Sequence, residues 1–202
     1  YEVADEYGFL SEIENITSVG SMTPEWVSHT FTNEYSDEIS QTGYILENPL
    51  ARQALAGKQN TGVDALPIGP LNYDIAGEDS FDYFEPTCSA EFASSSEWMI
   101  GEGDGERVHP RYTTERAIEA GRSRDMGRLI VHYNYPHEPY PKAEGSLSKP
   151  INSLSTKEIN SEQVWEDYVN NLRLVLDEVE ILLDNLSADN VVRSSVVVDT
   201  FS

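Results

Sequence analysis

A loop with three prolines, which also carries His137 and Glu138, follows an apolar run near residue 130. Residues 129–131 read LIV, and residues 132–141 read HYNYPHEPYP. Proline fixes its own backbone angle and lacks an amide donor, so these prolines exclude helix and strand and hold His137 on a stiff loop. A histidine there can bind an oxyanion as imidazolium, or a metal ion as the neutral ring. The alternative is a structural loop whose side chains only pack. Glu138 is either an acid–base group or a solvated glutamate.

A second candidate lies in residues 17–26, TSVGSMTPEW. Thr23 followed by Pro24 predicts the start of a helix, with Thr23 as the N-cap and Pro24 in the first turn. A hydroxyl at a helix N-terminus faces unpaired N–H groups and the positive end of the helix dipole. Such a site binds phosphate or sulfate and lowers the cost of an alkoxide. Thr23 is therefore either a plain capping residue or a nucleophile.

The composition excludes several classes of function. Asp and Glu number 36 against 13 Lys and Arg, which gives a net charge of −23. This imbalance excludes nucleic-acid binding through a general basic surface and disfavours anionic membranes. Acid excess with few lysines is typical of a protein in very high salt, where self-repulsion is screened, although an ordinary acidic domain is the alternative. Cys88 is the only cysteine, so we expect a half-buried residue and no disulfide.

The back half of the chain predicts alternating helices and strands. Asn160 and Gln163 form a helix cap, and apolar residues then recur at steps of three and four as far as Leu186. Residues 112–126 predict a shorter helix, capped by Thr113 or Thr114 and closed by Gly127. The apolar run 129–131 predicts a central strand, and Val191-Val192 begins another.

The front half is less regular. It predicts a strand at Ile13–Val19, a helix at Pro24–Phe31 and a strand at Gly43–Leu46. Residues 57–107 are rich in Gly, Pro, Ser and aromatics and predict short irregular elements. Residues 1–202 thus read as a single α/β domain, with a central mainly parallel sheet and helices on both faces. In such sheets, reactive groups gather at the carboxyl ends of the strands.

Several segments resemble one known family. Residues 128–140, RLIVHYNYPHEPY, resemble the strand and PHxPY loop of sulfatase-like proteins of the alkaline phosphatase superfamily, in the form common in halophilic archaea. The long helix with Trp165, Tyr168 and Leu172, followed by ADNVV at 188–192, is similar to the same family. Residues 21–24, SMTP, with Tyr44 and the NP at 48–49, resemble its nucleophile turn and next strand. The resemblance covers most of the chain, and residues 57–107 match least.

The resemblance implies hydrolysis or transfer of sulfate or phosphate esters, with a small molecule or glycan as substrate and one or two divalent metal ions as cofactor. Thr23 matches the position of the nucleophile, with Ser21 as the alternative register. His137 matches a histidine that contacts the transferred group in the transition state. A formylglycine nucleophile requires a Cys/Ser-x-Pro-x-Arg pattern, which the sequence lacks.

The sequence also departs from this family. Its first metal-binding aspartates would precede Tyr1, and the Asp-His-Gly expected soon after Val192 is absent; Asp199 stands alone and is not assigned as a ligand. We therefore expect a fragment or truncated copy that is inactive as it stands and has no metal ligands of its own. With no apolar run near the ~20 residues of a membrane span and no signal peptide, we expect a cytoplasmic protein with no membrane partner.

An alternative function is that of a non-enzymatic acidic α/β domain that binds a protein or glycan partner. Its binding surface would be the aromatic-rich middle of the chain, with Tyr73, Phe81, Tyr83, Phe84, Phe92 and Trp98.

Overall fold

The fold is built around a sheet of three parallel strands. The computed structural model describes residues 3–10, 17–56, 74–88, 98–100, 107–141, 148 and 160–187. Within these residues the strand order is β2-β1-β5, with β1 at Thr42–Leu46, β2 at Tyr83–Pro86 and β5 at Arg128–His132. The strands predicted at 43–46 and 129–131 are both present, but the prediction that 129–131 is a central strand is wrong, because β5 lies at an edge of the described sheet.

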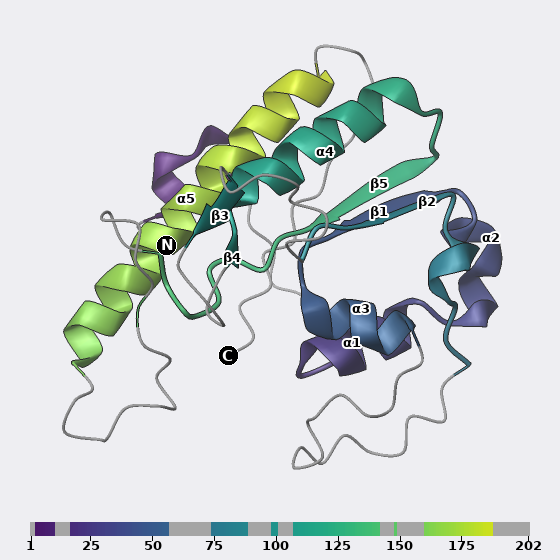
Figure 1. Cartoon of the computed structure of the whole chain (residues 1–202), viewed down its shortest axis with the longest axis horizontal. Coiled ribbons are helices and arrows are strands. Elements are labelled where there is room, and N and C mark those ends of the chain that lie inside the picture. Colours follow the sequence, from purple (N-terminus) through teal and green to yellow (C-terminus); the bar gives the residue numbers. More distant parts are fainter. Residues whose placement is uncertain are drawn as a thin grey trace.

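Helices cover both faces of this sheet (Figure 1). On one face, α4 (Pro110–Ser123) lies against the strands, and α5 (Ser161–Ser187) packs along α4. On the other face lie α1 (Thr23–Thr30) and α3 (Pro49–Leu55), which contact each other. This arrangement confirms the predicted α/β class.

The remaining elements are short. They are the 3₁₀ helices η1 (Ala4–Glu6), η2 (Gly8–Leu10), η3 (Asn33–Tyr35) and η4 (Glu78–Ser80), the helix α2 (Ser36–Ile39), and an antiparallel pair formed by β3 (Met99–Ile100) and β4 (Arg107–Val108). The described parts of residues 57–107 are thus short elements, as predicted.

Alternate residues of the central strand face two separate cores. Tyr44 and Leu46 point to the α1/α3 face and pack with Val27 and Phe31, whereas Ile45 points to the α4/α5 face. There it joins a cluster completed by Ala117, Ala120, Leu182 and Leu186. Because β1 is buried along its whole length, its near-continuous apolar sequence is that of a central parallel strand.

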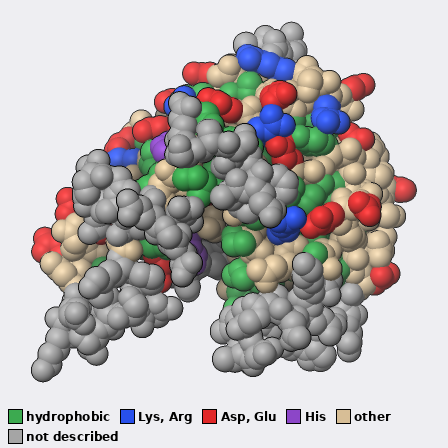
Figure 2. Space-filling view, viewed as in Figure 1, with side chains coloured by type: hydrophobic (Ala, Val, Ile, Leu, Met, Phe, Trp, Pro, Cys, Tyr) green, Lys and Arg blue, Asp and Glu red, His purple; other side chains and the backbone are tan. Residues whose placement is uncertain are grey.

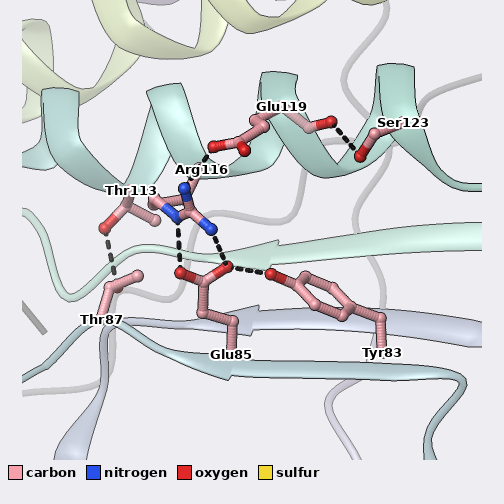
Figure 3. A network of polar contacts seen from close by, with 7 residues as sticks. All are labelled: Tyr83, Glu85, Thr87, Thr113, Arg116, Glu119 and Ser123. Atoms are coloured by element: carbon pink, nitrogen blue, oxygen red, sulfur yellow. Dashed lines mark hydrogen bonds and ion pairs between the residues drawn. The ribbon is translucent and has the colours of Figure 1, made fainter.

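The strand β2 also carries polar groups on the face covered by α4 (Figure 3). Glu85 accepts hydrogen bonds from the Arg116 guanidinium of α4, at 2.5 Å from Nε, and from the Tyr83 hydroxyl. One residue beyond the strand, the Thr87 hydroxyl lies 2.9 Å from that of Thr113 on α4. A partly buried ion pair thus joins β2 to α4, in addition to the packing of Tyr83 and Phe84 against the two cores.

The long helix α5 confirms the prediction at its N-terminus. The Asn160 side chain accepts hydrogen bonds from the backbone amides of Glu162 and Gln163, at 3.2 and 3.4 Å. The first residues of the chain are fastened to the same helix. The Tyr7 hydroxyl lies 2.7 Å from a carboxylate oxygen of Asp177, and Arg173 forms an ion pair with Glu6 at 2.6 Å.

The predicted caps of α4 are wrong. The helix begins at Pro110, and the Nδ1 atom of His109 accepts the backbone amide of Arg111 at 3.1 Å. Thr113 and Thr114 lie inside the helix, fully buried, and their hydroxyls are used in contacts with other segments. The helix ends at Ser123, and Gly127 does not close it.

The predicted role of Thr23 as the N-cap of α1 is also wrong. Met22 occupies that position with an extended backbone, and Thr23 is the first helical residue. The helix predicted at Pro24–Phe31 is otherwise confirmed. The strand predicted at Ile13–Val19 is absent from its described part, residues 17–19, while residues 11–16 and the strand predicted at 191–192 lie outside the described residues.

Acidic side chains are scattered around the face of the molecule shown in Figure 2, with fewer basic ones among them. None of the helices in the described ranges is long and apolar enough to cross a membrane.

Candidate functional site

The three parallel strands end at the same edge of the sheet, where polar groups gather. Leu46 pairs with Pro86 of β2 and with His132 of β5. The parallel ladder continues for one step, because the amide of Glu47 donates to the carbonyl of His132 at 2.9 Å and the amide of Thr87 donates to that of Leu46 at 2.8 Å. Glu47, Thr87 and the loop after β5 therefore lie next to one another.

Glu47 is the most deeply buried carboxyl group at this edge. Its residue is 3% exposed and projects to the α4 face, where the Thr113 hydroxyl lies 3.5 Å from its carboxylate. Burial raises the pKa of Glu47 to about 7, although the Arg107 charge and hydrogen bonds from the Asn134 backbone amide and the Thr113 hydroxyl act in the opposite direction. A carboxyl group with such a pKa can exchange a proton near neutral pH.

Arg107 fastens the loop that carries His137. Its guanidinium donates hydrogen bonds to three backbone carbonyls: Asn134 at 2.8 Å, Pro139 at 2.9 Å, and His137. The same group lies over the Tyr135 ring, 4.4 Å from its centroid. Although Arg107 is only 8% exposed, the loop therefore supplies acceptors for three of its five N–H donors.

His137 itself is exposed on this loop. Its Nδ1 atom lies 2.6 Å from the carbonyl oxygen of Glu138, so Nδ1 carries the proton and Nε2 is left for an external partner. The peptide bonds before Pro136 and Pro139 are cis. The prolines predicted that His137 lies on a loop, but the sequence did not predict the hydrogen bonds from Arg107 to that loop.

Thr23 lies on the other face of the sheet, at the first turn of α1, and is 8% exposed. The alternative nucleophile Ser21 is exposed, and both its amide and its hydroxyl bind the Glu25 carboxylate, at 2.7 and 2.8 Å. These bonds hold the pKa of Glu25 below its ordinary value. Ser21 thus acts as part of the helix start, whereas Thr23 is a buried residue.

The contact between α1 and β5 runs through two rings. Trp26, one turn after Thr23, meets the His132 ring edge-on at 5.9 Å between centroids. The Nδ1 atom of His132 lies 2.7 Å from the Tyr44 hydroxyl, and Nε2 has no hydrogen-bond partner. Burial lowers the pKa of His132 to about 4 and keeps the ring neutral. The hydrogen bonds of His137, in contrast, do not reach Thr23.

The family resemblance implies a divalent metal ion, and the described residues do not fit one. In the part of the chain that the structure describes, no three His, Cys, Asp or Glu side chains are grouped so that they could hold a metal ion. A hard divalent cation needs several oxygen ligands, so we assign no reaction step to a metal ion. Cys88 is half-buried, and burial raises the pKa of its thiol. Asp199 lies outside the described residues.

The aromatic side chains of the middle segment are mostly used inside the protein. Phe81 is buried, and Phe84 packs against the same core. Trp98 packs against the ring of Tyr112 on α4, at 5.9 Å between centroids. Tyr73 and Phe92 lie outside the described residues.

Two residues at the sheet edge, Glu47 and Arg107, were missed from the sequence. The signal for Glu47 was an acidic residue placed directly after the mainly apolar strand TGYIL. Nothing comparable marks Arg107, which lies in a two-residue strand.

Comparisons of this chain with protein-family models, with curated proteins and with solved structures find no match.

Proposed function

We propose that this chain carries reaction-site residues of a sulfatase-like enzyme of the alkaline phosphatase superfamily, acting on sulfate or phosphate esters of a small molecule or glycan. One observation supports the proposal: β5 runs directly into the His137 loop at the carboxyl end of a parallel sheet. In open α/β sheets, that edge is the usual position of a reaction site. The roles of Thr23 and His137 come from the sequence resemblance.

In the proposed reaction, the Thr23 hydroxyl attacks the sulfur or phosphorus atom of the ester. A bond from Thr23 Oγ1 to that atom forms while its bond to the alcohol oxygen breaks, and the hydroxyl proton leaves with the alcohol. Water then hydrolyses the threonine ester and releases sulfate or phosphate. The protonated His137 ring donates a hydrogen bond to the oxygens of the transferred group, where negative charge gathers.

The first test measures ligand binding, because the sequence leads us to expect no turnover from the chain as it stands. Inorganic sulfate or phosphate is titrated into the ¹⁵N-labelled chain in molar salt, and the amide resonances of Glu138 and Tyr140, which lie in the same loop and are present in every variant, are followed by NMR. We expect saturable shifts that disappear in His137→Gln. His29→Gln, on the described helix α1, is the control and should bind normally. Shifts that persist in His137→Gln, or no shifts at all, would contradict the proposal.

The second test measures turnover of nitrophenyl phosphate and sulfate in molar salt with added Mn²⁺, Mg²⁺ or Zn²⁺. Turnover lost in Thr23→Ala but kept in Thr30→Ala, at the other end of α1, would support the nucleophile and overturn the expected inactivity. Turnover that Thr23→Ala leaves unchanged would refute the role of Thr23.

The alternative function, partner binding through the aromatic middle, has less support. The described aromatic side chains Phe81 and Phe84 belong to the core around Tyr44, which leaves them no part in a binding surface.

A further inference from the structure

The loop that carries His137 is held at one residue, Asn134, by three residues from two segments of the chain. The backbone amide of Asn134 hydrogen-bonds the Glu47 carboxylate, and its carbonyl accepts a hydrogen bond from Arg107 at 2.8 Å. Its side-chain oxygen accepts a hydrogen bond from Asn48 Nδ2 at 3.2 Å. Asn48 is itself fixed, because its own side-chain oxygen caps α3 through two backbone amides.

Glu47 and Arg107, the two charged residues of this arrangement, bind different backbone groups of the loop. Glu47 binds the amide at the start of the loop, while Arg107 binds carbonyls from Asn134 to Pro139. Arg107 also bonds the carbonyl of His137. A planar guanidinium with five donors can satisfy three carbonyls at once, which a lysine ammonium cannot do with the same geometry. The position of the His137 backbone therefore depends on both residues.

Among the groups around Glu47, we expect only Glu47 itself to change its charge near pH 7. Thr113 on α4 offers only a hydroxyl, and the further pair Arg111–Glu178 is closed on itself at 2.7 Å. The ionisable groups that face Glu47 are Arg107 of β4, Cys88 after β2, and Tyr133 and Tyr135 after β5. Burial raises the pKa values of this thiol and of both phenols, so they stay neutral while Glu47 titrates near pH 7.

We propose that Glu47 and Arg107 are positioning residues for the His137 loop, and that ionisation of Glu47 tightens this loop and so regulates the binding of an anionic ester at His137. The ionised carboxylate of Glu47 accepts a strong hydrogen bond from the Asn134 amide and attracts the Arg107 charge. The protonated carboxyl group accepts a weaker hydrogen bond and attracts Arg107 less. The identity of the ligand rests on the proposed function, but the positioning role does not.

The positioning role is tested without any ligand, by following the Asn134 amide resonance against pH in the full-length chain. The measurement is made in the His137→Gln background, so that the Asn134 signal does not report on the His137 ring. We expect a sigmoidal shift of the Asn134 amide centred near pH 7, lost when Glu47→Gln is added. Thr113→Val, which removes only the long hydroxyl contact, should keep the titration. A flat curve in the starting background, or a titration that survives Glu47→Gln, would overturn the proposal.

Arg107 is tested by amide hydrogen exchange in Arg107→Lys. We expect faster exchange, by about tenfold, for the Tyr140 amide at the end of the loop, with unchanged protection of the β1 amides. Unchanged exchange throughout, or equal loss of protection in β1, would show that Arg107 does not position the loop specifically.

The regulatory half is tested with inorganic sulfate as the probe. Between about pH 6 and about pH 8, sulfate binding to the wild-type chain should tighten about tenfold more than sulfate binding to Glu47→Gln does. Any pH dependence that does not involve Glu47 is common to both chains and cancels in this comparison. Equal pH dependence in the two chains would overturn the regulation. No sulfate binding in either chain would overturn the regulation and the proposed function together, while the amide titration would still decide the positioning role.

Discussion

Replacement of Glu47 by Gln is expected to change how the stability of this protein depends on pH. Glutamine keeps the shape of the protonated side chain but cannot ionise. In the folded protein the pKa of Glu47 is raised from 4.5 to about 7, mainly by burial. The folded state therefore binds a proton more tightly than the unfolded chain does. The stabilisation from this proton is complete below pH 4.5 and is lost as the pH rises through about 7.

The size of the effect follows from that interval. Each pKa unit corresponds to about 1.4 kcal/mol, so the interval from 4.5 to about 7 corresponds to about 3 kcal/mol. His132 acts in the opposite direction, because its pKa falls from 6.5 to about 4 on folding and its contribution is lost as the pH falls. The two slopes oppose each other between pH 4.5 and 6.5 in the wild type. The informative quantity is therefore the difference between variant and wild type.

The assay is denaturant unfolding of both chains at constant molar salt, from about pH 5 to about pH 8. We expect the free energy of unfolding of Glu47→Gln to rise relative to that of the wild type by about 3 kcal/mol over this range. Glu166→Gln, on the exposed side of α5, is the control and should show no comparable change. If the difference between Glu47→Gln and wild type stays constant with pH, Glu47 does not titrate in this range and the reasoning fails.

Three further substitutions test the packing of the long helix. Arg111→Ala leaves the buried carboxylate of Glu178 without its ion-pair partner and should lower the free energy of unfolding by about 1–3 kcal/mol, while Arg111→Lys should lose less. Gly121→Ala places a methyl group 2.7 Å from a methyl carbon of Leu186, so it should destabilise the protein by about 1 kcal/mol. Leu186→Ala should lower the free energy of unfolding by less in the Gly121→Ala background than in the wild type, because it removes this clash. Leu176→Ala, at 2% exposure, should cost about 2–5 kcal/mol in thermal or chemical unfolding, and a loss below 1 kcal/mol would contradict its place in the core.

The elements that could be predicted are those in which one local signal dominates. The apolar stripe and the Asn160 cap define α5 without help from the rest of the chain. The apolar run of β1 is buried along its whole length, as composition indicates for a central strand, whereas β5 lies at an edge of the described sheet and its apolar residues are only half-buried. The α/β class followed from these elements.

The strand β2 was not predicted, because tertiary contacts decide its place. Its sequence, YFEP, carries a carboxylate that is partly buried and forms an ion pair with Arg116 of α4, more than 30 residues away in the sequence. The prediction of where α4 begins was wrong for a related reason. Thr113 and Thr114 are good capping residues, but their hydroxyls bond other segments, and His109 caps the helix instead.

The candidate site could be predicted only in part. The prolines around His137 indicate a loop after a strand, and the structure has that loop. The catalytic roles of Thr23 and His137 remain predictions. Arg107 could not be found from the sequence, because its carbonyl partners lie 27 to 32 residues further along the chain. A single arginine in an irregular segment carries no signal of that kind.

The link between Tyr7 and α5 also has a consequence for biosynthesis. The hydroxyl of Tyr7 and the carboxylate of Asp177 are separated by 170 residues of chain. At about 5–20 residues per second, a ribosome needs on the order of 10 s or more to make the second partner after the first. During that time the first residues of this chain have none of their contacts with α5. They can take their place only after the last described helix has left the ribosome.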